Sequence, residues 1–279
     1  MRPSVHARSE VGFVAWILGR RGGVVLFRLG DEALSEATPM KSMMRMHPLA
    51  GASLILIGSA CVAARGDFMI GDTVTPTFQS VEAGRSVSWT FDGAGGTATG
   101  GLLAWSGGLQ SFCVQLEENV SVGQAVSFEV VGPESLPDAP PMPGPMGSVR
   151  SALVQDLYSR SYESMIIMTG SALQDQAAAF QMVIWEITHE LSADDTDLAS
   201  LVADLDLSSG DATFASTAAV DAIAQDLIAN LGFNGFRPFS RLRGLTNETY
   251  QDQLIVVPGT GALAGLAGVV LLGRRRPRP

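Results

Sequence analysis

The sequence predicts an α+β fold, in which a β-sandwich or β-barrel carries an inserted helical subdomain. Three observations lead to this prediction: short β-prone runs follow residue 70, a helical period replaces them near residue 146, and strand-like composition returns near residue 235. Runs of strands followed by runs of helices are typical of α+β domains. We therefore expect β structure over 70–132, helices over 146–232 and β structure again over 235–257.

The first β segment is predicted from short runs of β-branched and aromatic residues that glycine-rich turns separate. The clearest turn is the run Asp92-Gly93-Ala94-Gly95-Gly96. The run 125–131 alternates apolar and polar residues, as a half-buried strand does. The expected strands cover 74–78, 87–91, 102–105, 110–116 and 125–131.

A proline-rich stretch from Pro133 to Pro145, with six prolines, follows these strands and is expected to be a stiff, exposed connector. After it, apolar residues recur every three or four positions, which is the spacing of an amphipathic helix. Gly232 is expected to stop the last helix. The predicted helices cover 149–158, 177–191, 198–205 and 218–231, and the final strands cover 236–245 and 250–257.

The N-terminal region predicts export. Residues 40–64 contain a basic segment, an apolar segment and a small-residue cleavage zone, which are the parts of a signal peptide. The apolar run is shorter than the ~20 residues of a good membrane span, so we expect cleavage after Ala64; a membrane anchor is the alternative. Residues 1–39 hold apolar runs broken by arginines, and we interpret them as an over-extended reading frame.

The C-terminus has the three parts of a sorting tail. Pro258 and Gly259 form a turn signal, residues 260–273 are apolar, and a cationic end follows, made of Arg274, Arg275 and Arg276. Arginines after an apolar segment favour the cytoplasmic side of a membrane.

This tail resembles the PEP-CTERM sorting signal of Gram-negative envelopes, although Val257-Pro258-Gly259 stands where the family has Pro-Glu-Pro. The resemblance implies an exosortase-like processing protease as a partner, transient anchoring by the tail helix, and a final place at the cell surface or outside the cell. A permanent membrane anchor is the alternative.

The segment between the two signals is strongly acidic. The whole chain has a net charge of −10, and residues 66–257 contain no lysine and six arginines. Such a charge excludes nucleic acid as an expected partner, and the missing lysine excludes a Lys–Asn isopeptide crosslink. A protein that stores an amine-reactive bond benefits from having no amine of its own, although compositional drift is the simpler explanation of the absence.

Cys113 is the only cysteine after residue 64, so it has no disulfide partner within the mature chain. It follows Phe112 in a predicted strand, and the run Phe180-Gln181-Met182-Val183-Ile184-Trp185 lies in a predicted helix. Because Gln181, Ile184 and Trp185 are three and four positions apart, they share a helix face. A cysteine thiol and a glutamine carboxamide can condense to a thioester with loss of ammonia.

The two motifs resemble the thioester domains of bacterial surface adhesins, in which a strand cysteine is paired with the glutamine of an apolar-Gln-x-x-apolar-Trp helix. The resemblance spans residues 78–257 in element order. It implies a non-enzymatic adhesion protein without cofactor or metal, which captures an amine-bearing surface or matrix molecule through a bond between Cys113 and Gln181. The residues expected to shield this bond from water are Phe112, Phe180, Ile184 and Trp185.

The chemistry also sets a requirement. The thiolate must attack the carboxamide carbon, whereas burial in apolar surroundings raises the pKa of a thiol. Some hydrogen-bond donor must therefore polarise the amide oxygen, and the sequence does not identify it.

Other interpretations remain open. A buried cysteine beside an aromatic helix is an ordinary core arrangement, and the chain would then be a non-reactive matrix or biofilm protein that its tail sorts. Cys113 and His189 could form a nucleophile pair. Asp194, Asp195 and Asp197 could bind calcium, but without an EF-hand pattern a helix N-terminus is the better expectation.

Overall fold

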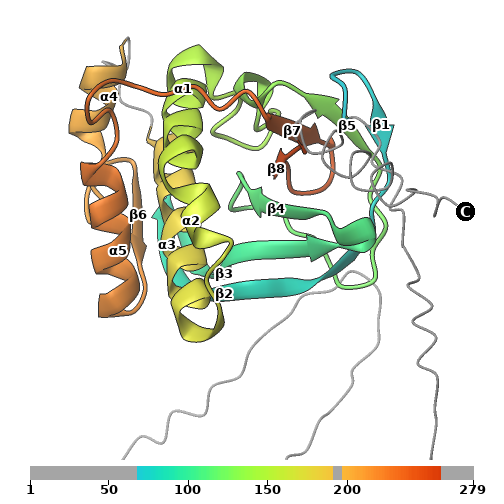
Figure 1. The fold of residues 1–279 in the computed structure, drawn as a ribbon, viewed down its shortest axis with the longest axis horizontal. Coiled ribbons are helices and arrows are strands. Elements are labelled where there is room, and N and C mark those ends of the chain that lie inside the picture. The colour runs from blue at the N-terminus through green and yellow to red at the C-terminus, as the bar shows by residue number, and fades with distance from the viewer. Residues whose placement is uncertain (1–67, 191–196, 259–279) are drawn as a thin grey trace, which may run out of the picture. The chain divides into compact units, whose positions relative to one another are not determined.

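A computed structural model describes residues 68–190 and 197–258. One antiparallel sheet and a group of helices make up this part of the chain (Figure 1), which confirms the predicted α+β class. The predicted over-extended segment 1–39, the signal peptide 40–64, and Gly259 with the three terminal arginines lie outside the described residues. Among the described residues, no helix combines the length and apolar character that crossing a membrane requires.

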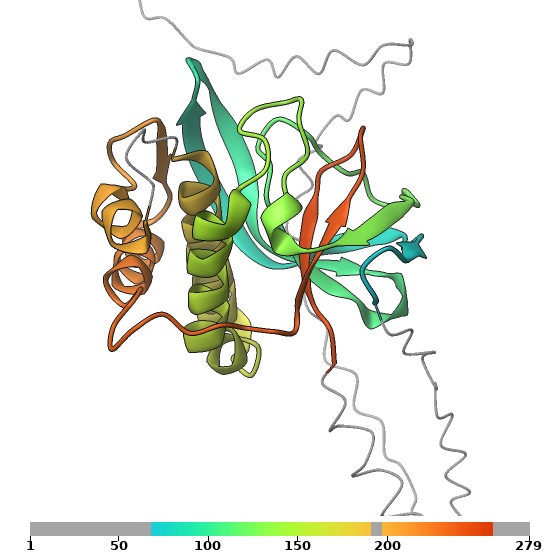
Figure 2. The same ribbon diagram turned by 90° about the horizontal axis from the view of Figure 1, so that it is seen from above.

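The eight strands of the described residues belong to a single sheet with the order β1-β5-β7-β8-β4-β3-β2-β6. The sheet is strongly curled (Figure 2), and a backbone bridge between Thr77 and Ala125 joins the segments that precede β2 and β5. The bounds are β1 (Thr73–Val74), β2 (Phe78–Phe91), β3 (Ala94–Trp105), β4 (Gln110–Cys113), β5 (Phe128–Val131), β6 (Ala212–Ala215), β7 (Leu242–Thr246) and β8 (Gln253–Val256).

Strands β2 and β3 form a long hairpin, much longer than the predicted strands. Its turn is only Asp92 and Gly93, whose φ angles of 47° and 73° are both left-handed, as a two-residue hairpin turn of the primed type requires. The remaining glycines of the predicted turn continue into β3. At Gly101, a Cβ would lie 2.1 Å from the Ala83 carbonyl oxygen, so the two strands approach closely there.

The helices lie between β5 and β7 in the chain, as predicted, but with one strand among them. They are α1 (Gly147–Leu157), a π-helical turn (Tyr158–Tyr162), α2 (Glu163–Met165), α3 (Gly170–His189), α4 (Leu198–Asp204) and α5 (Ala218–Ala229). Helix α3 packs on β2 and β3, and α5 packs on α3. The prediction of an all-helical segment is wrong at β6, which pairs with the edge of β2.

The proline-rich stretch is only partly exposed, which corrects the prediction of a stiff, exposed connector. Leu136 is fully buried, and its carbonyl oxygen accepts a hydrogen bond of 2.7 Å from the amide of buried Met146. The Leu136 side chain packs so tightly over Gly244 of β7 that a Cβ there would lie 2.7 Å from it. An apolar anchor at each end therefore fixes this segment against the sheet.

Aromatic side chains fill the core on two sides. Phe78, Trp105 and Phe128 meet edge to face, with ring centroids 5.2 and 5.5 Å apart, as aromatic quadrupoles favour. Phe112 of β4 instead packs against Phe180 of α3. Strand β4 thus sits between the two sets of aromatic side chains.

Candidate functional site

Cys113 is the last residue of β4, at a place where the sheet opens. On one side β4 pairs with β8, where Cys113 stands opposite Gln253. On the other side β4 pairs with β3 only at Ser111 and Gln110. Cys113 is two positions beyond Ser111, so its main-chain N–H and C=O point to the same edge of β4 as those of Ser111. No residue of β3 is paired with them.

The side chain of Gln181 makes the two main-chain hydrogen bonds that a neighbouring strand would otherwise make at Cys113. The Cys113 amide donates to Gln181 Oε1 at 3.1 Å, and Gln181 Nε2 donates to the Cys113 carbonyl oxygen at 2.7 Å. Two residues in an antiparallel ladder exchange hydrogen bonds in this way. The arrangement also brings Cys113 Sγ to 3.4 Å from Gln181 Oε1. The predicted pair is therefore in direct contact, and Gln181 is fully buried.

Gly100 of β3 makes room for this contact. A Cβ there would lie 3.2 Å from the Trp185 ring, 3.5 Å from Gln181 Cγ and 2.9 Å from Val87 Cγ2. Real Cβ contacts are seldom so short, so any larger residue would press on the helix. The side chains of Gln181 and Trp185 thus lie side by side above a bare stretch of strand.

The residues predicted to shield the bond are all buried. The rings of Phe112 and Phe180 are tilted by 43° with centroids 4.9 Å apart, and the Tyr158 ring meets Phe180 edge-on at the same distance. Trp185 stacks on Phe214 of β6 at 6.0 Å. Ile184 is fully enclosed on the same helix, and Cys113 itself is 4 % exposed. Water has little direct access to the sulfur.

Burial makes Cys113 a weak acid. Desolvation raises the pKa of its thiol to about 12, while the Trp185 side chain and the Cys113 main-chain amide, as hydrogen-bond donors, lower it. The group is therefore a thiol at neutral pH, which is the effect of burial that the sequence argument set against thiolate attack. Burial also raises the pKa of Tyr158 well above its ordinary value, and the neighbouring Tyr162 and Cys113 add to the effect.

The amide N–H of Cys113 is a donor of the kind that the sequence could not identify. It points at Gln181 Oε1, the oxygen on which negative charge develops when a nucleophile adds to the carboxamide carbon. Donors fixed toward such an oxygen before reaction are a large source of rate enhancement in acyl transfer. Cys113 thus presents both a sulfur and a polarising N–H to the same carboxamide.

His189 is not placed to serve Cys113. It lies eight residues beyond Gln181 on α3, a rise of about 12 Å. Its Nδ1 contacts Thr188 Oγ1 and the Trp185 carbonyl oxygen, and its ring packs edge-on against Phe91. Burial lowers the pKa of His189 to about 4, so its ring is neutral. These contacts give no support to a cysteine–histidine nucleophile pair.

The acidic residues show no metal site within the described ranges, where no group of three or more potential ligands is placed to hold an ion. Asp197 caps α4 by accepting from the amides of Ala199 and Ser200, both at 2.9 Å. This arrangement confirms the expected helix N-terminus. Asp194 and Asp195 lie outside the described residues.

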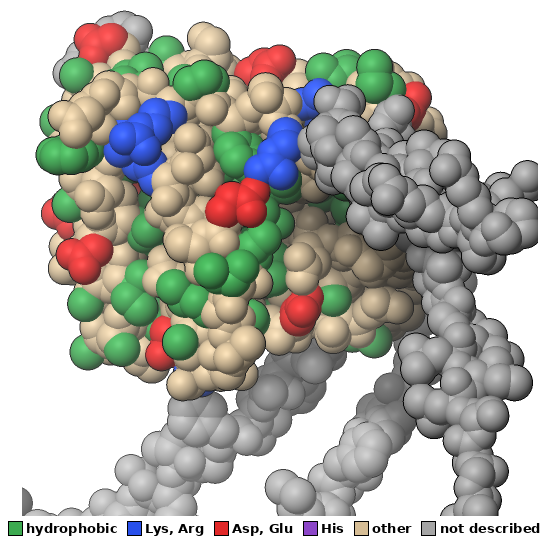
Figure 3. Space-filling view, in the orientation of Figure 1, with side chains coloured by type: hydrophobic (Ala, Val, Ile, Leu, Met, Phe, Trp, Pro, Cys, Tyr) green, Lys and Arg blue, Asp and Glu red, His purple; other side chains and the backbone are tan. Residues whose placement is uncertain are grey.

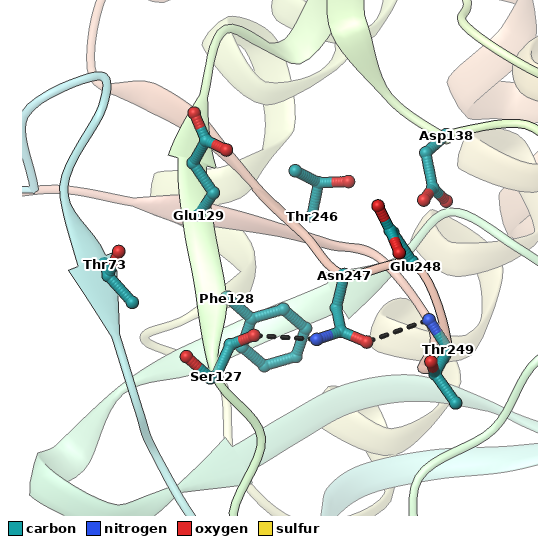
Figure 4. Close-up of a pocket in the computed structure, with 9 residues that line it drawn as sticks. All are labelled: Thr73, Ser127, Phe128, Glu129, Asp138, Thr246, Asn247, Glu248 and Thr249. Carbon is teal, nitrogen blue, oxygen red and sulfur yellow. Dashed lines mark hydrogen bonds between the residues drawn. The ribbon is translucent and has the colours of Figure 1, made fainter.

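A separate hollow lies at the β1–β5 end of the sheet (Figure 4). Its volume is about 530 Å³, and its polar lining includes Glu129, Asp138 and Glu248. The Asn247 side chain lines the hollow, where it donates to the Ser127 carbonyl oxygen and accepts from the Thr249 amide. None of the predicted site residues lines this hollow.

Sequence reasoning missed two residues of the site. Tyr158 is only the last residue of the predicted helix 149–158, and nothing in the neighbouring sequence marks it as close to Cys113. Gly100 had a readable signal, because a glycine inside a β-prone run indicates a bulge or a close approach of another segment. Only the glycines of residues 92–96 were used in the prediction, as a turn, and Gly100 was not.

Comparison with family models, curated proteins and solved structures finds no match to this chain.

Proposed function

We propose that this protein is an exported, non-enzymatic surface protein in which Cys113 and Gln181 form an internal thioester that captures an amine-bearing partner. The observation that carries the proposal is the pairing of the Gln181 carboxamide with both main-chain groups of Cys113, with the sulfur 3.4 Å from Oε1. The reaction partners are held together before any bond forms, and such positioning is a major part of intramolecular rate enhancement.

Bond formation needs no group from outside. The Cys113 sulfur attacks the side-chain carbonyl carbon of Gln181, a C–S bond forms and the C–N bond breaks. The thiol proton goes to the departing nitrogen, which leaves as ammonia. In capture, an amine nitrogen attacks the same carbon, the C–S bond breaks, and the sulfur regains a proton from the amine.

The charge of the protein supports an amine as partner. Primary amines are cations at neutral pH, and the chain has a net charge of −10, which favours encounter with cations. On the face shown in Figure 3, acidic and basic side chains are scattered among uncharged ones. The attraction is therefore a general one.

The tail and the signal region complete the proposal. The signal peptide 40–64 directs export, the segment 260–273 anchors the chain transiently, and an exosortase-like protease releases it at the surface. The test is C-terminal peptide mapping of the surface-located protein. Recovery of an intact Arg274-Arg275-Arg276 end would contradict release and leave only an anchor.

Intact-mass measurement tests the thioester. The mass of the native protein should be lower than the mass of its sequence by one ammonia. Methylamine should add its own mass to the protein and free Cys113, which then reacts with an alkylating agent after denaturation. The matched control is Cys113→Ala, which keeps the main-chain hydrogen bonds and should show neither mass change. A native mass equal to that of the sequence, with Cys113 fully alkylated after denaturation, would contradict the proposal.

One observation favours a second function, a non-reactive matrix or biofilm protein. The Gln181 carboxamide completes the hydrogen bonds of a strand end, which is a sufficient structural role, and the pKa of Cys113 near 12 opposes thiolate formation. In that case Cys113→Ala should leave surface retention and matrix association unchanged. Loss of covalent adducts in this variant would favour the thioester instead.

A further inference from the structure

The indole N–H of Trp185 is a buried donor without an acceptor. Trp185 is 1 % exposed, and its Nε1 has no hydrogen-bond partner in the part of the chain that the structure describes. Trp105, which is equally buried, donates from its Nε1 to Ser111 Oγ at 2.8 Å. Because buried polar groups are almost always paired, the exception at Trp185 calls for an explanation.

The position of Trp185 suggests one. It lies one helical turn beyond Gln181, and both side chains pass over Gly100. Stacking on Phe214, with 20° between the ring planes, fixes the orientation of the indole. The Trp185 side chain also lowers the pKa of the Cys113 thiol against the effect of burial, as a donor close to the sulfur does. The indole N–H and the sulfur are therefore neighbours, although no hydrogen bond joins them in the resting thiol.

We propose that the Trp185 indole N–H donates a hydrogen bond to the Cys113 sulfur when that sulfur becomes negatively charged. The inference rests on the proposed thioester and assigns Trp185 a chemical role in addition to shielding. As the thiol gives up its proton to the departing ammonia, the N–H stabilises the charge on sulfur before the C–S bond is complete. The same contact stabilises the sulfur as a leaving group when an amine opens the bond.

The other groups around the sulfur define the control. The Cys113 amide is already engaged with Gln181 Oε1. Tyr158 is buried near Cys113, and its hydroxyl is likewise without a partner among the described residues. Tyr158 therefore belongs to the site and is not a neutral control. Trp105→Phe, which removes a buried indole whose N–H is paired with Ser111, is the matched control for Trp185→Phe.

The first experiment follows closure of the bond. Ammonia opens the thioester back to thiol and carboxamide, and after its removal the loss of mass reports the closure rate. A hydrogen bond to a charged group is worth enough that Trp185→Phe should slow closure about tenfold or more, across the pH range. Trp105→Phe should close at the rate of the unchanged protein. Equal rates for Trp185→Phe and the unchanged protein, or equal slowing by Trp105→Phe, would overturn the inference.

The second experiment needs no substitution at Trp185. In the unreacted protein, the NMR signal of the Trp185 indole N–H is compared with that of Cys113→Ala, in which the sulfur is missing. Because the indole N–H lies beside the thiol, loss of the sulfur should shift this signal, while the Trp105 signal, whose partner is Ser111, stays in place. A Trp185 signal that does not move would overturn the inference.

The two proposals can fail separately. If the protein never loses ammonia, the thioester proposal fails, and the NMR comparison still decides whether the indole contacts the sulfur. If ammonia is lost and Trp185→Phe closes at the unchanged rate, the thioester proposal holds and the proposed role of the indole is wrong.

Discussion

Replacing Gln181 by leucine tests whether its carboxamide completes the strand end at Cys113. The substitution is best made in a Cys113→Ala background, where no thioester can form and the main-chain groups of position 113 remain. Leucine has nearly the volume of glutamine but offers no hydrogen bonds. It therefore leaves one buried N–H and one buried C=O without the partners at 3.1 and 2.7 Å.

The magnitude follows from those two groups. A buried donor or acceptor that loses its partner costs about 1 to 3 kcal/mol, so the free energy of unfolding should fall by about 2 to 6 kcal/mol. Met182→Leu is the control, because Met182 is the next residue, is fully buried and is replaced at similar volume for less than about 1.5 kcal/mol. Denaturant unfolding with unchanged m-values measures both.

A loss no larger than that of the control would refute this account of the site. Hydrogen exchange gives a second reading, since the amide of position 113 should lose its protection when leucine replaces Gln181. The reasoning also implies that a Gln181 substitution is a poor non-reactive control for function, because it removes structural hydrogen bonds along with the electrophile.

Three further changes follow from the structure. Gly100→Ala should lower the free energy of unfolding by about 1 to 3 kcal/mol, because its Cβ would overpack against Val87 and Trp185. Gly96→Ala should lower it less, since its Cβ would lie 3.3 Å from the Trp89 ring, and thermal unfolding measures both. Burial raises the pKa of Glu186 to about 8, so stability should fall as pH rises from the unfolded value near 4.5, by up to about 5 kcal/mol. Glu186→Gln should remove that slope in denaturant titrations at several pH values, and an unchanged slope would contradict the assignment. Asp156→Ala should lower the free energy of unfolding by about 3 to 5 kcal/mol. This fully buried carboxylate accepts from the Arg160 side chain and from the main-chain amides of Gly232 and Arg237. Asp175→Ala, at a partly exposed pair with Arg85, should lower it by less than about 1 kcal/mol.

The predicted fold class and order of elements came from hydrophobic period, which is local information. The errors lie where distant segments decide the structure. Strand β6 is only four residues long, and its pairing with β2 is not visible in its own composition. The proline-rich stretch looks like an exposed connector until Leu136 is seen to fill a space above Gly244.

The site divides in the same way. The contact between Cys113 and Gln181 was predicted from the resemblance of two short motifs to thioester domains, and the structure brings these two residues together. The polarising donor was not, because it is a main-chain N–H, which every residue except proline carries. Its availability depends on β3 leaving the edge of β4 after Ser111, a feature of strand register that no residue type encodes.

The hydrogen bonds around Cys113 also indicate how an amine would be received. Before reaction, Gln181 Nε2 donates to the Cys113 carbonyl oxygen. In the proposed reaction, loss of ammonia removes that donor, while the thioester oxygen still accepts from the Cys113 amide. The Cys113 carbonyl oxygen would then be a buried acceptor without a partner, which carries a free-energy cost. An incoming amine would donate an N–H to this oxygen from the place that the ammonia left, and from there its nitrogen would be next to the carbon it must attack. In the proposed reaction, the place that releases ammonia is thus by the same geometry the place that receives a primary amine.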